Sequence, residues 1–171
     1  MKHRTPWSAA LLCWLLCLAL LTACGGSTAE AGTAGSCTVS ISCATILDNL
    51  DQLNAAKADF VPDDGVILPE TELSFTEGET AFDLLQRLCR DNGISMESSW
   101  SPLYKTAYIE GIANLYEFDC GKLSGWMYSV NGEFPNYGCS GYTLQDGDVI
   151  CWVYTCDLGE DVGGGYAAGG E

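Results

Sequence analysis

The chain has 171 residues and is strongly acidic, with 23 Asp and Glu against 7 Lys and Arg and a net charge of −16. A surface of this charge repels phosphate backbones, so we expect no nucleic-acid partner. The single histidine is His3, which leaves the rest of the chain without the commonest general base and the usual nitrogen ligand for zinc.

The first 23 residues have the three-part pattern of an export signal. Lys2, His3 and Arg4 precede an apolar run over 9–21, and at about 13 residues this run is shorter than the roughly 20 that span a bilayer. The run ends in Leu21-Thr22-Ala23-Cys24, which resembles the bacterial lipobox. We therefore predict a signal peptide over 1–23 and lipid attachment at Cys24. The alternative is an ordinary secretory signal in which Cys24 is one more thiol.

A lipid on Cys24 would place the protein outside the cytoplasm and make the lipid its contact with the cell membrane, because two or more acyl chains anchor stably. Without residues 1–23, five basic residues face 23 acidic ones, a net charge of −18. Gly, Ser, Thr and Ala dominate 24–36, which predicts a flexible tether, and 159–171 reads as a Gly-rich tail. One domain is expected between them, over 37–158.

The first half of this domain predicts two strands and a short helix between them. Residues 37–43 alternate strictly, with Cys37, Val39, Ile41 and Cys43 on one face. Residues 48–60 carry apolar side chains at helical spacing and end before a Pro-Asp-Asp-Gly turn, and 72–76 predict the second strand.

The strongest helix signal begins at Thr80. Thr80 and Asp83 have the spacing of a capping box, and Gly93 stands where a C-terminal cap belongs. Between them an apolar stripe is formed by Ala81, Phe82, Leu85, Leu88 and Cys89. This stripe predicts a helix that packs on a sheet.

Short strands are predicted after the helix, at 94–98, 107–112, 116–118, 126–130 and 148–155. Asn131-Gly132 follows the fourth of these, and both residues tolerate positive φ, so a hairpin turn is expected there. Strands around one main helix indicate an α+β domain, a mixed sheet with the helix packed on one face.

Two further segments are distinctive: 125–132, Gly-Trp-Met-Tyr-Ser-Val-Asn-Gly, and 142–154, which contains Leu-Gln-Asp-Gly-Asp and Trp-Val-Tyr. Together with 78–85 and 108–112 they resemble the DUF4430 family, the transcobalamin-like C-terminal domain, over about residues 70–156. The resemblance implies a β-grasp-like fold of the kind found in soluble-ligand-binding domains. A fold does not by itself determine the ligand.

The resemblance also implies where a ligand would be contacted. In the vitamin B12 carriers a similar domain closes over cobalamin, which a helical barrel holds. The corresponding positions here are Trp126, Tyr128, Asn131, Phe134, Asn136, Tyr137 and Tyr142. Aromatic faces and amides suit a flat, partly apolar ligand. The alternative is that the strand aromatics, including Trp152 and Tyr154, are simply core.

Disulfides are expected in an exported protein. Cys37 and Cys43 lie six residues apart in one strand, about 20 Å, and cannot bridge each other. We predict Cys120 with Cys139 across the central hairpin and Cys43 with Cys156 between the first and last strands, although spacing alone leaves the connectivity open. Cys89 is expected to be a buried thiol. No Cys-x-x-Cys pair is present, so no metal site is predicted.

Two functions remain open. The first is a binding module for a small soluble ligand, which the resemblance suggests to be cobalamin or another corrinoid, acting with a helical-barrel protein or a vitamin transporter and holding no covalent cofactor. The second is a surface module for protein interaction or adhesion without a small ligand. An enzyme is not expected, because the paired carboxylates at 63–64 and 146–148 lie in turn motifs.

Overall fold

The computed structural model describes residues 32–165. The elements in chain order are β1 (Thr33–Ser42), η1 (Ala44–Asp48), η2 (Ala55–Phe60), β2 (Val66–Thr76), α2 (Ala81–Asn92), β3 (Met96–Ser101), β4 (Thr106–Ile112), β5 (Leu115–Tyr116), β6 (Gly125–Val130), η3 (Cys139–Gly141), β7 (Val149–Thr155) and η4 (Glu160–Val162). The predicted signal peptide, Cys24 and most of the predicted tether lie outside the described residues.

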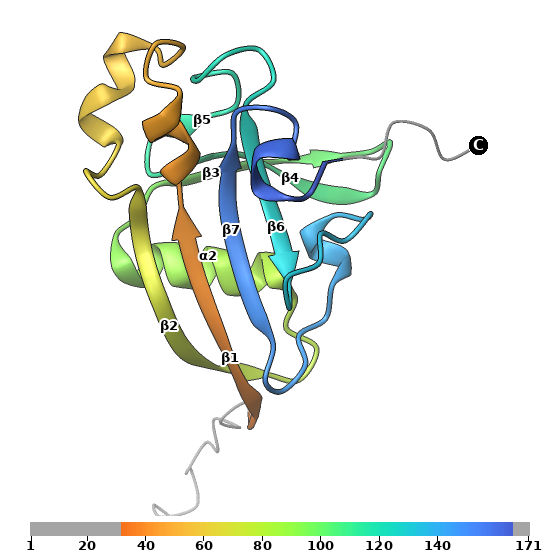
Figure 1. The fold of residues 1–171 in the computed structure, drawn as a ribbon. Helices are drawn as coiled ribbons and strands as arrows, with labels where there is room; N and C mark the ends of the chain where they lie inside the picture. The colour runs from red at the N-terminus through yellow and green to blue at the C-terminus, as the bar shows by residue number, and fades with distance from the viewer. Residues whose placement is uncertain (1–31, 166–171) are drawn as a thin grey trace, which may run out of the picture. The chain divides into compact units, whose positions relative to one another are not determined.

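A four-stranded mixed sheet is the centre of the domain. Its order is β2-β1-β7-β6, with β1 parallel to β7 and the other neighbours antiparallel. The alternation predicted for β1 is confirmed, since Val39 and Ile41 are fully buried and aligned with Ile150 and Trp152 of β7. Figure 1 shows α2 crossing behind this sheet. The α+β prediction is therefore confirmed.

Helix α2 begins and ends as the sequence predicts. The side chain of Thr80 accepts a hydrogen bond from the Asp83 amide, and the Asp83 carboxylate accepts one from the Thr80 amide, which completes the capping box. Gly93 ends the helix at φ 66°, a left-handed conformation that suits glycine. The buried face of the helix consists of Ala81, Leu84, Leu85, Leu88 and Cys89.

The remaining strands form a separate sheet of three, in the order β3-β4-β5. β3 and β4 are an antiparallel hairpin, and β4 buries Ala107, Ile109 and Ile112 on its inner side. The domain thus has two sheets where the sequence predicted one. Their inner faces contribute to a single hydrophobic core.

Four segments differ from the predictions. β1 begins at Thr33, so residues 33–36 of the predicted tether belong to this strand. Residues 48–60 contain no α-helix: the 3₁₀ helices η1 and η2 flank a turn that bridges Leu53 to Cys120, and the Leu50 side chain is exposed. β2 begins six residues earlier than predicted. The predicted tail begins with η4, because the Asp161 carboxylate accepts hydrogen bonds from Thr155 and the Cys156 amide.

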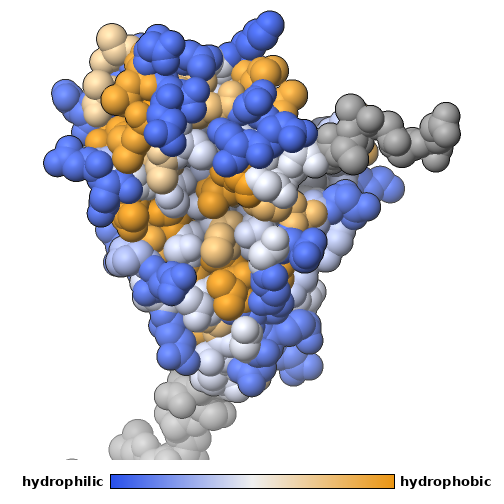
Figure 2. Space-filling view, in the orientation of Figure 1, coloured by the Kyte–Doolittle hydropathy of each residue, from blue (hydrophilic) through white to orange (hydrophobic). Residues whose placement is uncertain are grey.

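The face of the sheet turned away from α2 is mixed in character. Figure 2 shows separate apolar patches surrounded by hydrophilic residues on this face. Val66 and Val149 are among the exposed apolar side chains of these strands. Within residues 32–165, no helix is long and apolar enough to cross a membrane.

We expect Thr80→Ala to lower the free energy of unfolding by about 1 kcal/mol, because the first turn of α2 loses its side-chain cap. Urea denaturation followed by circular dichroism would measure the change. Gln86→Ala, an exposed position in the same helix, is the matched control. An equal stability of both variants would contradict the role given to the capping box.

Candidate functional site

A groove lined by aromatic residues lies between β4, β6 and the loop that follows β6. Its volume is about 640 Å³, within the range of small-molecule sites. The lining residues, which define the aromatic groove, are Tyr104, Thr106, Ala107, Tyr108, Ile109, Trp126, Met127, Tyr128, Phe134, Pro135, Asn136, Tyr137, Gly138, Cys139 and Trp152.

The floor of the aromatic groove is built by facing residues of β6 and β7. Tyr128 is paired with Trp152 across the strands, and their rings stack at 5.5 Å between centroids. Trp126 is paired with Tyr154, edge to face at 5.3 Å. Such pairs stabilise a sheet beyond the area they bury. The floor is therefore a rigid apolar surface.

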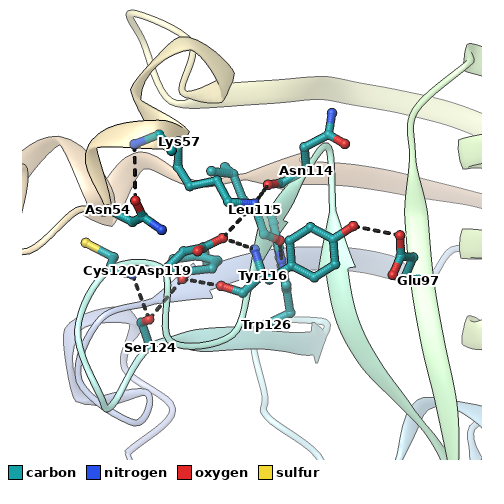
Figure 3. A network of polar contacts seen from close by, with 12 residues as sticks. Asn54, Lys57, Glu97, Asn114, Leu115, Tyr116, Asp119, Cys120, Ser124 and Trp126 are labelled. Carbon is teal, nitrogen blue, oxygen red and sulfur yellow. Dashed lines mark hydrogen bonds and ion pairs between the residues drawn. The ribbon is translucent and has the colours of Figure 1, made fainter.

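Trp126 is anchored to the second sheet by a polar network. Its Nε1 donates to the Leu115 carbonyl at 2.8 Å. Beside it, Lys57 Nζ lies 3.2 Å from the Asp119 carboxylate and 4.4 Å from the centre of the Tyr116 ring, a cation–π contact. Figure 3 shows these residues gathered around the turn that precedes β6. The indole plane is fixed before any ligand arrives.

The loop after β6 forms one wall. The Tyr128 hydroxyl donates to the Tyr137 carbonyl at 2.9 Å, and the Ser140 hydroxyl accepts from the Ala107 amide at 3.0 Å. A Cβ on Gly138 would come within 2.0 Å of Thr106 Oγ1, so only glycine allows this close approach to β4. The Tyr137 ring itself is 50% exposed.

The opposite wall comes from the β3–β4 hairpin. The Tyr108 hydroxyl donates to the Glu117 carboxylate at 2.5 Å. Burial, followed by this hydrogen bond, raises the pKa of Tyr108, so the phenol stays neutral at physiological pH. Tyr104, at the tip of the hairpin, is 76% exposed. The groove thus has a buried floor and an open, aromatic rim.

The C-terminal segment closes one margin of the groove. A Cβ on Gly164 would meet the Phe134 ring at 2.5 Å, and one on Gly159 would meet the Met127 sulfur at 2.8 Å. These glycines therefore pack directly on two groove residues. Residues 159–164, predicted as part of a flexible tail, contribute to the site.

Two features define what the aromatic groove can bind. None of its lining residues is charged, although the chain carries a net charge of −16. Trp152 is 1% exposed, and its Nε1 is buried without a hydrogen-bond partner among the described residues. An unpaired buried N–H costs about 1–3 kcal/mol. This atom is closed to solvent, so a ligand resting on the floor does not reach it.

Five of the seven predicted ligand residues line the groove: Trp126, Tyr128, Phe134, Asn136 and Tyr137. The other two lie elsewhere, on the buried carboxylate of Asp148. Asn131 Nδ2 donates to Asp148 Oδ1 at 2.9 Å and the Tyr142 hydroxyl donates to Oδ2 at 2.8 Å. The structure thus gives Asn131 and Tyr142 a part in holding the start of β7.

Sequence reasoning missed the contribution of the β3–β4 hairpin. Tyr104, Tyr108 and Ile109 line the groove only because the second sheet packs against β6. The available signal was the group of aromatics Trp100, Tyr104 and Tyr108 around one turn. Trp152, read as a core residue, is both core and groove floor.

The predicted disulfide between Cys43 and Cys156 is absent from the structure, in which all seven described cysteines are free. The parallel register of β1 and β7 puts Cys43 level with Tyr154. Cys156 follows Tyr154 by two residues, and its sulfur lies 3.9 Å from Thr45 Oγ1. The first and last strands are neighbours, as the prediction required, but Cys43 and Cys156 stand at different levels along them and form no bridge.

The predicted disulfide between Cys120 and Cys139 is also absent. The segment after Asn131-Gly132 does not return as a strand; it leads into η3, and β6 pairs with β7 instead. As a result the Cys139 sulfur lies 3.8 Å from the Ala107 carbonyl, whereas the Cys120 sulfur lies 3.4 Å from the Asn49 carbonyl. Across residues 32–165, no group of three or more His, Cys, Asp or Glu is placed to hold a metal ion.

Comparison with known proteins matches part of the chain to a described family. Residues 78–156 match the model of DUF4430, a domain of unknown function. No curated protein matches the chain. Among solved structures, a candidate metal-binding protein from Ruminococcus gnavus ATCC 29149 is similar at 17% identity and a TM-score of 0.40, with 71% of this chain and 96% of that one covered. Haptocorrin in complex with Cbi is similar at 16% identity and a TM-score of 0.46, with 79% of this chain but 29% of haptocorrin covered.

We expect Tyr128→Phe to lower the free energy of unfolding by about 1 kcal/mol, because the partly buried hydrogen bond to the Tyr137 carbonyl is lost. Chemical denaturation followed by tryptophan fluorescence would measure this. Tyr104→Phe, which changes an exposed hydroxyl, is the control and should leave stability unaltered. An unchanged free energy of unfolding in both variants would show that the Tyr128 hydroxyl does not stabilise the loop after β6.

Under reducing conditions, stability should fall as pH rises from about 9 to 11. Burial raises the pKa of Cys43, Cys89 and Cys139 from 9.0 to about 11. The unfolded chain therefore loses these protons first, and its ionisation favours unfolding above pH 9. Urea midpoints measured across this range should decline, and less steeply for Cys89→Ala. Cys151→Ala, at a partly exposed thiol, is the control.

Proposed function

We propose that the protein is a non-catalytic binding module of the cell surface, anchored by lipid on Cys24, whose aromatic groove takes a small soluble ligand. The anchor rests on the lipobox-like sequence 21–24. It would keep the domain outside the cytoplasm, on a tether of residues 24–32.

The observation that carries this proposal is an uncharged aromatic groove in a strongly acidic protein. Net charge on the surface keeps such a protein soluble and repels anions. A groove with a stacked floor and no charged lining residue offers its binding energy instead to flat, uncharged surfaces. Its volume of about 640 Å³ suits a ligand of cofactor size.

The ligand class follows from the groups that the groove presents. The Trp126, Tyr128 and Tyr137 rings supply area at low entropic cost, and Asn136 supplies an exposed amide at the rim. A corrinoid combines a flat macrocycle with peripheral amide groups and is therefore the first probe. No histidine follows His3, so cobalt would keep a ligand from elsewhere.

A second candidate function, protein interaction without a small ligand, is supported by the tip of the β3–β4 hairpin. Trp100, Leu103 and Tyr104 are 61%, 80% and 76% exposed. Exposed apolar side chains gathered at one place often mark a contact with another protein. A helical-barrel protein or a vitamin transporter that covers this tip would be compatible with both functions.

We expect the chain without residues 1–23 to bind cyanocobalamin or cobinamide with a Kd between about micromolar and millimolar, because one face covers only part of so large a ligand. Asn136→Ala should weaken binding by up to about tenfold through loss of one exposed amide. Tyr137→Ala should weaken it through loss of an exposed ring. Isothermal titration calorimetry measures all three.

Trp100→Ala is the matched control, since Trp100 is aromatic and exposed but does not line the groove. Saturable heat that is lost in Tyr137→Ala and kept in Trp100→Ala supports the ligand-binding function. An absence of heat up to millimolar corrinoid would favour the protein-interaction function. In that case, crosslinking on intact cells should capture a partner that Trp100→Ala loses and Tyr137→Ala retains.

A further inference from the structure

Two buried cysteines that the sequence assigned to different bridges lie beside each other. The antiparallel register pairs Gly125 with Thr155, so Ser124 and Cys156 are the next residues on each strand. The Ser124 hydroxyl accepts a hydrogen bond from the Cys120 amide at 3.1 Å. Cys120 is therefore held next to Ser124, and Ser124 is the residue that stands opposite Cys156. Figure 3 shows Cys120 and Ser124 in this turn.

The sulfur atoms of the two residues contact the same short segment of chain. Cys120 Sγ lies 3.4 Å from the Asn49 carbonyl oxygen, and Cys156 Sγ lies 3.9 Å from Thr45 Oγ1. The Asn49 side chain in turn donates to the Thr45 carbonyl at 2.8 Å. Both sulfurs therefore contact residues 45–49, which belong to η1 and the residue after it. This contact is evidence for their closeness that does not depend on the strand register.

The pKa values of the two thiols reflect both their burial and their closeness. Burial, the largest cause, raises the pKa of both, that of Cys156 to about 12, and for each thiol the other is a further influence.

We propose that Cys120 and Cys156 form a disulfide that ties the end of β7 to the turn before β6. This bridge is distinct from the ligand-binding function and would close a loop containing the whole of β6, η3 and β7. The tie would lie next to Trp126 on the groove floor. It would also hold together two segments on which Tyr154 already depends, since its hydroxyl contacts Ser124.

The oxidant is a small or enzymatic disulfide of the kind found outside the cytoplasm. The Cys120 thiolate attacks one sulfur of the oxidant and forms a mixed disulfide with it, while the S–S bond of the oxidant breaks and its other sulfur leaves and takes up a proton. The Cys156 thiolate then attacks the Cys120 sulfur of the mixed disulfide, and the second thiol leaves. Two thiols lose two protons and two electrons to the oxidant, which becomes two thiols.

Burial determines when this chemistry can occur. Cys120 is fully buried and Cys156 is 6% exposed, and their raised pKa values keep the thiolate fraction low in the folded protein. We therefore expect the bond to form during oxidative folding and to form slowly once the reduced domain has folded.

The test is to refold the full chain with oxidised and reduced glutathione, block the remaining thiols and map peptides without reduction. No Lys or Arg follows Lys122, so trypsin alone leaves Cys139, Cys151 and Cys156 on one peptide. Chymotrypsin added after trypsin separates them. The expected result is one linked pair of peptides containing Cys120 and Cys156, two hydrogen atoms lighter than the sum of its reduced parts.

Cys120→Ser and Cys156→Ser should each abolish this pair, whereas Cys89→Ser should retain it. The oxidised protein should melt about 10 °C above the reduced one, as expected for a loop of this length, and this difference should vanish in Cys120→Ser. A link from either residue to another cysteine, or no link in a refolded protein that melts cooperatively, would overturn the proposal. Corrinoid titration of the same samples tests ligand binding separately. The disulfide can therefore be absent while binding is retained, or present while binding is absent.

Discussion

The placement of β7 between β1 and β6 is the constraint on which the rest of the domain depends. β7 is the last strand of the described residues and yet an inner strand of the sheet. Its inward side chains Ile150, Trp152 and Tyr154 fill the core, and two of them form the aromatic pairs of the groove floor. The parallel pairing with β1 joins segments more than 100 residues apart, so the core and the groove form together only when the chain is complete through residue 155.

The start of β7 is held by a buried carboxylate. Asp148 is 4% exposed, and it accepts hydrogen bonds from the Asn131 side chain, the Tyr142 hydroxyl and the Gln145 amide. A buried charge is tolerated when donors satisfy it in this way. The same network fixes both ends of the loop that forms one wall of the groove. Asn131 and Tyr142 thus position the loop that forms this wall without lining the groove themselves.

Local patterns predicted most of the fold, and non-local packing explains what they did not predict. The Thr80 cap, the alternation in β1 and the Asn131-Gly132 turn, with φ of 53° and 84°, each depend on a few neighbouring residues. The groove wall from the β3–β4 hairpin depends on how one sheet packs on the other. The neighbouring positions of Cys120 and Cys156 depend on a register that no spacing encodes. The 3₁₀ helices of 44–60 arise where too few side chains at helical spacing find a buried face.

The open rim of the aromatic groove links the proposed ligand to the proposed partner. The floor residues Trp126, Tyr128 and Trp152 are buried, while Tyr104 and Tyr137 on the two walls remain exposed. A flat ligand resting on this floor would leave its other face in water and lose the binding energy that enclosure provides. A second protein that covered that face would meet the exposed hairpin tip, with Trp100 and Leu103, at the same time. On this view the exposed aromatics serve ligand capture through a partner, and weak binding by the isolated domain is a consequence of its one-sided groove.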